Sequence, residues 1–385
     1  MEYKRLGDYI REVNVRNKDL KVTNLQGVSI SKLFIPSIAN TIGTDMSTYK
    51  VVNPGQFAYG PVTSRNGDKV SIALYKGGDD AIISQAYTVF EVVDKDKMSS
   101  DYLMMWFQRP EFDRHARFHS HGSAREIFDW DELCDTTIPV PSIERQREIV
   151  KEYETLSRRI RLNEQMIEKL EATAQALYRK MFVDGIDKEN LPKGWHLSNL
   201  GDYCKVITKG STPSTYNENG RVNFVKAETI SSKHCIEKKM LAHIDNDIHN
   251  HELKRSIIKE NDILFTIAGT LGKLCITDKS ILPANTNQAV AIIRVDESKI
   301  YPIDIYAMFV GGVHEDYCKR NIQQAVQANL SLETMFRLPI VLPPYDIMNE
   351  FHEQISSVFF SVYLKQQEII KLTELQSLLL AKMGQ

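Results

Sequence analysis

The sequence predicts an α+β protein with two similar domains, each followed by a long helix, and with the two helices pairing as an antiparallel coiled coil. Three observations lead to this prediction. The chain has 385 residues, which suits two domains of roughly 100–200 residues each. Short motifs recur in the same order in its two halves. Each half ends in a long stretch without proline that repeats apolar residues every seven positions.

The clearest repeat lies where each half passes into its long stretch. Superposing Pro141 on Pro343 also superposes, without a gap, Leu170 on Leu372. The sequence Leu-Gly-Asp-Tyr occurs at positions 6–9 and again at 200–203. The chain is therefore a duplication. The expected segments are a first domain at residues 1–141, a first long helix at 142–184, a linker and second domain at 185–343, and a second long helix at 344–385.

Each domain segment alternates β-branched or aromatic runs with turns rich in Gly, Asn and Ser, as short strands do. Two further segments have a helical pattern. We expect two α+β domains of one type. The predicted strands are Ala81–Val93, Asp262–Thr266, Ala289–Val295 and Pro339–Leu342, and the predicted short helices are Asp101–Gln108 and Ile303–Gly311.

Each long stretch is expected to form one helix of about 60 Å, since an α-helix rises 1.5 Å per residue. The sevenfold spacing is that of a coiled-coil seam. The polar residues Asn163 and Lys365 hold equivalent mid-helix positions, so an antiparallel pairing brings them into one layer that fixes the register. Separate packing of each helix on its own domain is the alternative. The predicted seam residues are Ile149, Leu156, Asn163, Leu170, Leu177, Val358, Lys365, Leu372 and Leu379.

The second long helix carries more apolar side chains than a two-stranded seam uses. Exposed apolar patches of this kind mark protein interfaces, so we infer that helices of a partner protein complete a bundle. Packing against the chain's own domains is the alternative that the sequence leaves open. The apolar residues outside the seam are Phe359, Phe360, Tyr363, Ile370, Leu375 and Leu378.

The composition, 42% hydrophobic and 25% charged, is that of a folded protein. With 48 basic and 50 acidic side chains, the chain is unsuited to coating nucleic acid indiscriminately, although a local basic groove is compatible with this balance. The longest uncharged apolar stretch, 355–364, is half of the about 20 residues that a bilayer span requires. No signal peptide pattern opens the chain. We expect no membrane span, a cytoplasmic location and reduced cysteines.

Two short motifs imitate catalytic sites. Leu342-Pro-Pro-Tyr345 resembles the base-binding loop of an adenine methyltransferase, but Leu342 stands where a hydrogen-bond acceptor is needed. Gly269–Lys273 imitates a phosphate loop, but its spacing is too short and Leu274 replaces the Ser or Thr that binds magnesium. A strand turn with one exposed lysine is the expected structure there. We expect no catalytic residue, no metal and no cofactor bound by this chain.

Polar loop residues remain, and their types suit DNA recognition. Arg, Asn and Gln read base edges, whereas Ser, Thr and Lys position phosphates. For each residue, a turn former or solvated side chain is the alternative. The DNA-binding candidates of the first half are Ser64, Arg65, Asn66, Lys69, Ser84, Gln85, His119, His121 and Arg125. Those of the second half are Lys209, Ser211, Thr212, Lys226, Lys273, Asn287, Gln288, Gln324, Gln327 and Asn329.

Along its whole length, the chain resembles the specificity subunit of type I restriction-modification systems. The resemblance rests on the two domains, each followed by a long helix, and on short motifs in the family's order. These include Leu-Pro-Lys-Gly-Trp at 191–195, Gly-Ser-Thr-Pro at 210–213 and Met-Phe-Val-Asp-Gly at 181–185. Each motif is short, and their duplicated order is the specific feature. The first half departs from the pattern because it lacks the Pro-x-Gly-Trp opening.

The resemblance implies a non-catalytic protein that reads a bipartite target in double-stranded DNA, with one half-site per target-recognition domain and the helices as a spacer. It also implies that two methyltransferase subunits dock on the helical bundle and supply S-adenosylmethionine. Restriction subunits join for cleavage. A coiled-coil scaffold whose domains bind peptides or glycans is the alternative. A chain with its own methylation or cleavage activity is a third interpretation, which the absence of catalytic motifs disfavours.

Overall fold

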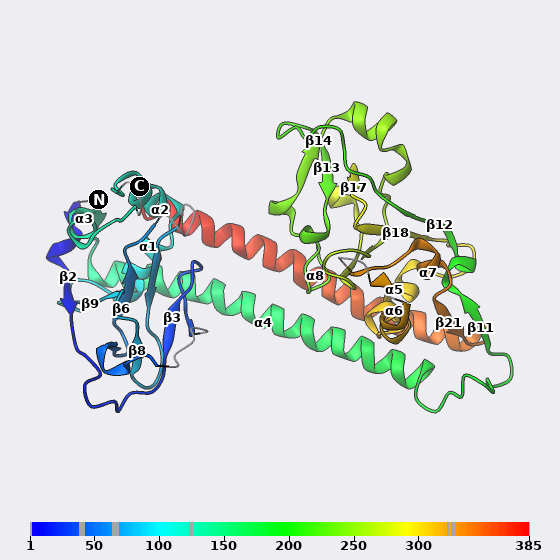
Figure 1. Cartoon of the computed structure of the whole chain (residues 1–385), viewed down its shortest axis with the longest axis horizontal. Coiled ribbons are helices and arrows are strands. Elements are labelled where there is room, and N and C mark those ends of the chain that lie inside the picture. Colours follow the sequence, from blue (N-terminus) through cyan, green and yellow to red (C-terminus); the bar gives the residue numbers. More distant parts are fainter. Residues whose placement is uncertain are drawn as a thin grey trace. The chain divides into compact units, whose positions relative to one another are not determined.

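The structure is a computed structural model and describes residues 2–37, 43–63, 69–122, 126–321, 323–324 and 328–384, with the backbone alone at 323, 324 and 328. The chain divides into two compact units. The first unit consists of Met1–Leu162 and Glu368–Gln385, and the second of Asn163–Gln367. Each unit therefore combines the strand-rich segment of one half with parts of both long helices (Figure 1).

The first unit is built on a four-stranded antiparallel sheet of order β2-β9-β6-β7. Three two-stranded sheets flank it: β1 with β10, β3 with β4, and β5 with β8. The strands are β1 (Tyr3–Arg5), β2 (Ile10–Val13), β3 (Gln26–Val28), β4 (Phe34–Pro36), β5 (Lys50–Val52), β6 (Phe57–Gly60), β7 (Ser71–Leu74), β8 (Ala81–Ile83), β9 (Thr88–Val92) and β10 (Thr137–Pro139).

Three short helices cover this sheet: α1 (Ser100–Phe107), α2 (Pro110–Phe118) and α3 (Trp130–Asp135). Each begins where the sequence supplies a start signal. The Ser99 and Asp129 side chains accept backbone N–H groups at the starts of α1 and α3, and Pro110 occupies the first turn of α2. Helix α1 buries its aromatic side chains on the sheet, with the Phe107 ring edge-on to Phe57 at 5.9 Å.

The second unit repeats this plan. Its four-stranded sheet has the order β12-β18-β15-β16, and a three-stranded sheet has the order β14-β13-β17. Strand β11 pairs with β21, and β19 with β20. The strands are β11 (His196–Asn199), β12 (Cys204–Lys209), β13 (Val222–Val225), β14 (Ala242–Ile244), β15 (Ile263–Thr266), β16 (Leu274–Ile276), β17 (Ala284–Thr286), β18 (Val290–Val295), β19 (Gln323–Gln324), β20 (Ala328–Asn329) and β21 (Pro339–Leu342); the short helices are α5 (Pro302–Val310), α6 (Glu315–Asn321) and α7 (Leu332–Phe336).

The two four-stranded sheets have the same strand order, since β2, β6, β7 and β9 correspond to β12, β15, β16 and β18 in sequence. The predicted α+β class with two similar domains is confirmed. The predicted short helices and three of the four predicted strands are present within two residues. The prediction of one strand over Ala81–Val93 is wrong, because a turn closed by Tyr87 N donating to Ser84 O (3.0 Å) separates β8 from β9.

The long helices are α4 (Ile143–Phe182, 40 residues) and α8 (Tyr345–Lys382, 38 residues). In the first unit, the early part of α4 lies beside the late part of α8 (Figure 1). There Gln376 Nε2 donates to Ser157 Oγ (2.6 Å), and Arg159 Nε pairs with Glu368 Oε1 (2.7 Å). The two chain ends also meet in this unit, where Tyr3 Oη donates to Gly384 O (2.9 Å).

In the second unit, the end of α4 contacts the start of α8, with the rings of Phe182 and Phe351 4.7 Å apart. All nine predicted seam residues are buried or half-buried. Of the apolar residues outside the seam, Phe359 does not await a partner protein: the alternative, packing against the chain's own domain, holds for it, because it is buried against Tyr306 of α5 (5.0 Å between rings). The other apolar residues of that set remain exposed: Phe360, Tyr363, Ile370, Leu375 and Leu378.

No helix in the described part of the chain is long and apolar enough to cross a membrane.

Candidate nucleic-acid interface

In the first unit, several predicted segments leave the main sheet at one end. The register pairs Gly60 with Ser71 and Tyr59 with Thr88, so the end of β6 lies beside the starts of β7 and β9. The β6–β7 connection and the turn before β9 therefore both emerge there. We call this the first loop end. It brings together the segments that contain Lys69 and the pair Ser84-Gln85.

A third segment, the loop after α2, joins the first loop end. Val62 and His121 both form β-bridges with Ile127, and Thr63 Oγ1 donates to Ser120 Oγ (2.9 Å). This places the loop that carries His119 and His121 beside the start of the β6–β7 connection. Glu132 of α3 faces both imidazoles, at 3.8 Å from His119 and 3.6 Å from His121. The remaining candidates of this half lie outside the described residues: Ser64, Arg65, Asn66 and Arg125.

A buried ion pair fixes the backbone next to Lys69. Asp113 Oδ1 of α2 accepts the Val70 amide (3.0 Å) and also lies 2.7 Å from Lys32 Nζ. Burial lowers the pKa of Lys32, and the Asp113 carboxylate opposes this shift. Because one carboxylate oxygen of Asp113 contacts both the Val70 amide and the Lys32 ammonium group, the backbone just before β7 is attached to α2.

The second unit has an equivalent loop end. The register pairs Lys209 with Ala291, Thr266 with Val290 and Phe265 with Leu274. The ends of β12 and β15 therefore lie beside the starts of β18 and β16. We call this the second loop end. The candidates on the connections that meet there are Lys209, Ser211, Thr212, Lys273, Asn287 and Gln288. Lys273, which was expected to be exposed, is half-buried, and its amide donates to Thr266 Oγ1 (2.9 Å).

Two of these candidates contact each other directly. Thr212 Oγ1 donates to Gln288 Oε1 (2.8 Å), which joins the loop after β12 to the loop before β18. The chain approaches closely here: a Cβ atom on Gly210 would lie 1.6 Å from Thr286 O. Glycine is therefore required at position 210, and this close packing explains the first residue of the Gly-Ser-Thr-Pro motif.

The second loop end gains two more candidates from neighbouring strands. Parallel pairing of Val225 with Thr286 places Lys226, at the end of β13, beside the Asn287 loop. Asn329 of β20 forms a β-bridge with Ala268 in the β15–β16 turn. Gln324 lies on β19, where only its backbone is described, and Gln327 lies outside the described residues. The candidates of the second half whose side chains are described therefore gather at the second loop end, from the four-stranded sheet and from neighbouring strands.

The structure adds residues that were not predicted. The Tyr216 ring, half exposed, lies 4.9 Å below Lys226 Nζ, and Arg255 Nη2 donates to Ser211 Oγ (3.4 Å). An aromatic residue in the polar loop after Thr212 was the available signal for Tyr216, since bases stack on aromatic rings. Arg255 is distant from Ser211 in sequence, so no local pattern indicates it.

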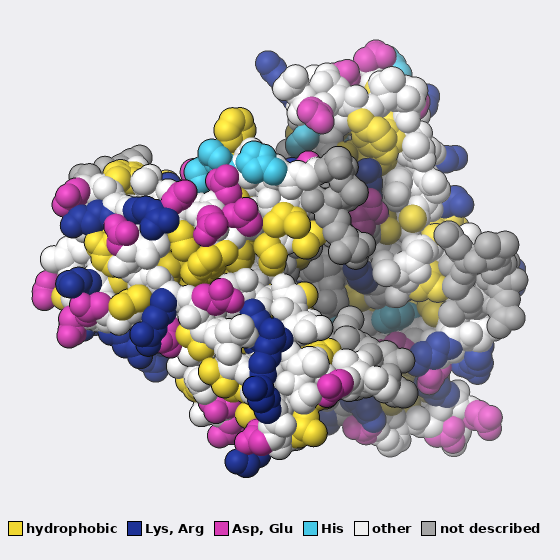
Figure 2. Space-filling view, turned by 60° about the vertical axis from the view of Figure 1, so that its left-hand side comes forward, with side chains coloured by type: hydrophobic (Ala, Val, Ile, Leu, Met, Phe, Trp, Pro, Cys, Tyr) yellow, Lys and Arg dark blue, Asp and Glu magenta, His cyan; other side chains and the backbone are white. Residues whose placement is uncertain are grey.

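Charges are mixed across the molecule. Figure 2 shows Lys and Arg side chains interspersed with Asp and Glu on the viewed face, which agrees with a net charge of −2.

Among the described residues, no group of three or more His, Cys, Asp or Glu side chains is placed to hold a metal ion. Burial raises the pKa of the Cys204 thiol to about 12 and that of Cys318 to about 11, so these thiols stay protonated at neutral pH.

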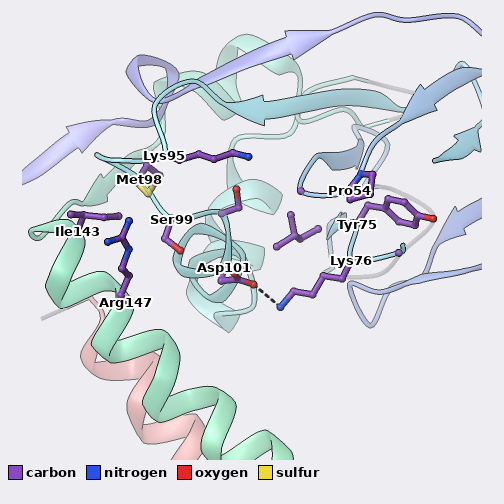
Figure 3. A pocket seen from close by; sticks show the side chains of 13 residues that line it. Pro54, Tyr75, Lys76, Lys95, Met98, Ser99, Asp101, Ile143 and Arg147 are labelled. Atoms are coloured by element: carbon purple, nitrogen blue, oxygen red, sulfur yellow. Dashed lines mark ion pairs between the residues drawn. The ribbon is translucent and has the colours of Figure 1, made fainter. Parts of the chain in front are cut away.

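The first unit also contains a pocket of about 450 Å³ between its four-stranded sheet and α4 (Figure 3). Lys76 crosses it, with Nζ 2.5 Å from Asp101 Oδ1 and 3.6 Å from Glu154 Oε1 of α4. Leu74, in its wall, pairs with Phe57, so the pocket opens at the sheet end opposite the first loop end. It belongs to the junction between the domain and α4.

The two units thus define a duplicated α+β protein in which two similar sheets each gather polar loop residues at the same end. The chain belongs to the family of the type I restriction modification DNA specificity domain, whose family model matches residues 45–172 and 192–380.

Individual relatives agree with this membership. The chain is 23% identical over 307 residues to the type I restriction enzyme MjaIX specificity subunit of Methanocaldococcus jannaschii, covering 76% of this chain and 70% of that protein. It is 20% identical over 456 residues to the HindI specificity subunit of Haemophilus influenzae, covering 98% and 97%. The crystal structure of a type I restriction-modification S subunit from M. genitalium has the same fold, with a TM-score of 0.58 at 12% identity, covering 100% of this chain and 96% of that one.

Proposed function

We propose that this chain is the DNA sequence-specificity subunit of a type I restriction-modification complex and that it reads a bipartite target, one half-site per unit. The observation that carries the proposal is the pair of equivalent loop ends, each of which gathers side chains suited to base edges and phosphates. The loops of the two ends differ in sequence, so the two half-sites differ.

The long helices are the spacer between the half-sites and pair as an antiparallel coiled coil. Contacts within each unit support this proposal. Early α4 meets late α8 in the first unit through Ser157 and Gln376, and late α4 meets early α8 in the second through Phe182 and Phe351. The burial of the seam residues agrees with the same pairing.

The exposed apolar side chains of α8 are where two methyltransferase subunits dock. Phe360 and Leu364 are 62% and 49% exposed in the second unit, and Leu375 and Leu378 are 50% and 60% exposed in the first. Helices of a partner that cover them complete a bundle. Those subunits supply S-adenosylmethionine and the catalytic loop, restriction subunits join for cleavage, and this chain is not catalytic.

Methylome mapping tests the proposal. The chain is co-expressed with the methyltransferase subunits of its own genome, and methylated adenines are located by single-molecule sequencing. The expected result is a split motif that disappears when this chain is deleted. A soluble complex that methylates no motif, or a motif that persists without the chain, contradicts the proposal.

A further inference from the structure

We infer that Phe118, at the end of α2, is an aromatic wedge that lies against a base of the first half-site. The inference rests on the proposed function, since it assigns the phenyl ring to the DNA that the first unit reads. Phe118 was not among the candidate residues, because hydrogen-bonding type was the criterion for choosing them. Phe118 is 82% exposed.

The helix directs this ring away from the protein core. Helix α2 packs through Phe112 and Ala116, which are 3% and 0% exposed and lie four residues apart on one face. Phe118 follows Ala116 by two residues, about 200° around the helix axis at 3.6 residues per turn. The exposure is therefore a consequence of the helix register. An apolar ring held in this way has no role in the core of the unit.

The backbone around Phe118 is fixed by hydrogen bonds. His119 N donates to His115 O (3.0 Å), and Ser120 Oγ donates to Ala116 O (2.6 Å). Thr63 Oγ1 donates to Ser120 Oγ (2.9 Å), which ties this turn to the strand end. The His119 ring meets the Phe118 ring edge-on at 5.1 Å. The phenyl ring is therefore presented by an ordered turn, which reduces the entropy lost on binding.

The position of the turn identifies the ligand. Ser120 and His121 lie at the first loop end, so Phe118 is within three residues of candidates chosen for DNA contact. A phenyl ring forms no hydrogen bond with a base edge. It can instead stack on a base, contact a thymine methyl group or insert into a base step. Polar side chains at the same loop end supply the hydrogen bonds, and Phe118 supplies apolar contact.

At the position equivalent to Phe118, the second unit has arginine. When Pro141 is superposed on Pro343, Phe118 falls on Arg320, one residue before the end of α6. The effect of Phe118 is therefore confined to the first half-site, and the second half-site is an internal control.

The test uses the assembled complex of this chain with its methyltransferase, and duplexes that carry the cognate split motif with 2-aminopurine at successive positions of the first half-site. For Phe118→Ala, we expect affinity for the cognate duplex to fall roughly 5- to 100-fold, the loss of one base–aromatic stack. We also expect the fluorescence change at one position to disappear. Phe118→Trp should restore both, because indole also stacks.

Val93→Ala is the matched control. Val93 is 53% exposed in the same unit and follows the other end of β9, with its amide bonded to Tyr9 O. It should leave DNA binding unchanged. Unchanged affinity and fluorescence in Phe118→Ala overturn the inference. Intact DNA binding with weakened methyltransferase assembly overturns it in favour of a protein contact. If the unmodified complex shows no sequence-dependent binding, the proposed function itself fails.

Discussion

At the scale of single residues, one hydrogen bond within the second loop end orients a side chain that is a candidate for contact with a base. The Thr212 hydroxyl donates to Gln288 Oε1, and this contact decides which edge of the Gln288 amide remains for a base. Asn329 of β20, which is exposed, offers a second amide beside the β15–β16 turn. Asn and Gln amides make bidentate contacts with adenine, so these two residues are the strongest base-reading candidates of the second unit.

Replacing Asn329 with Ala should weaken binding of the cognate DNA by about 1–3 kcal/mol, the usual loss for one bidentate base contact. Binding of unrelated DNA should change little, because that binding depends on phosphates. Titrations of both duplexes with the assembled complex measure the two affinities. Asn246→Ala is the control, since Asn246 follows β14 at the other end of the three-stranded sheet. Equal losses on both duplexes would place Asn329 among the phosphate contacts.

His314 gives the second unit a predictable pH dependence. It packs between the rings of Phe265 and Phe309 (5.1 and 5.3 Å), and burial lowers its pKa from 6.5 to about 4. Between pH 6.5 and about 4, His314 therefore binds a proton in the unfolded chain but stays neutral in the folded chain. The stability that depends on neutral His314 is complete above pH 6.5 and is lost as the pH falls towards 4.

This dependence is measured as the difference between wild type and His314→Phe. The free energy of unfolding, from urea titrations at pH 7.5, 6, 5 and 4, should fall in the wild type by up to about 3 kcal/mol more than in the variant. Asp304, whose pKa burial raises to about 6, titrates in the same range in both proteins and cancels in the difference. Parallel pH curves for the two proteins would show that His314 titrates normally.

At the scale of secondary-structure elements, periodic and repeated patterns were predictable from the sequence. The heptads predicted α4 and α8 because a long regular helix repeats one local geometry. The short helices α1 and α5 were predicted because they are apolar runs. The helices α2, α3, α6 and α7 were not predicted, since they mix charged and apolar residues over too few turns to show a period. The turn between β8 and β9 was missed because Ser84–Tyr87 interrupts the apolar run with only a few polar residues.

The candidate residues of the second unit were predictable by type, but their meeting at one end was not. That meeting depends on strand registers such as Lys209 with Ala291, which join segments distant in sequence. Arg255 was missed for the same reason, because it lies 44 residues from its partner Ser211 in sequence. Tyr216 had a local signal, an aromatic ring in a polar loop, that a search for hydrogen-bonding side chains passes over. The burial of Phe359 against Tyr306 likewise depends on how α5 lies on α8, which no heptad pattern contains.

One buried glutamine joins the start of α4 to the first domain. Gln146 is fully buried: its Oε1 accepts Ser99 N, and its Nε2 donates to Lys97 O and Pro141 O, each at 2.9 Å. Gln146→Ala leaves these buried groups unsatisfied and should destabilise the first unit by about 2–4 kcal/mol. Urea unfolding followed by tryptophan fluorescence measures the change. Gln165→Ala, at an exposed position of α4, should have almost no effect.

At the scale of the whole molecule, the near-neutral charge of this chain bears on how sequence recognition and general affinity for DNA are divided among subunits. The chain has 48 basic and 50 acidic side chains, and the described candidates include only four lysines, Lys69, Lys209, Lys226 and Lys273. Few phosphate contacts give weak, weakly salt-dependent binding. The proposed partner subunits therefore supply much of the phosphate affinity, and this chain supplies the choice of sequence.

The proposed spacer role of the helices leads to a prediction for the gap between half-sites. One heptad inserted after Leu162 of α4, matched by one after Gln367 of α8, lengthens both helices by about 10 Å at 1.5 Å per residue. This corresponds to about three base pairs at 3.4 Å each. Methylome mapping should show a longer gap with both half-sites unchanged. A motif with the original gap would contradict the spacer role.

The most direct test of the central claim, that each loop end reads one half-site, is the methylated motif of a variant altered at the second loop end alone. Thr212, Gln288 and Asn329 are replaced by alanine together, and the motif is mapped by single-molecule sequencing. We predict that the second half-site becomes relaxed or altered while the first half-site and the gap stay as in the wild type. Loss of specificity in both half-sites together, or an unchanged motif, would contradict the claim.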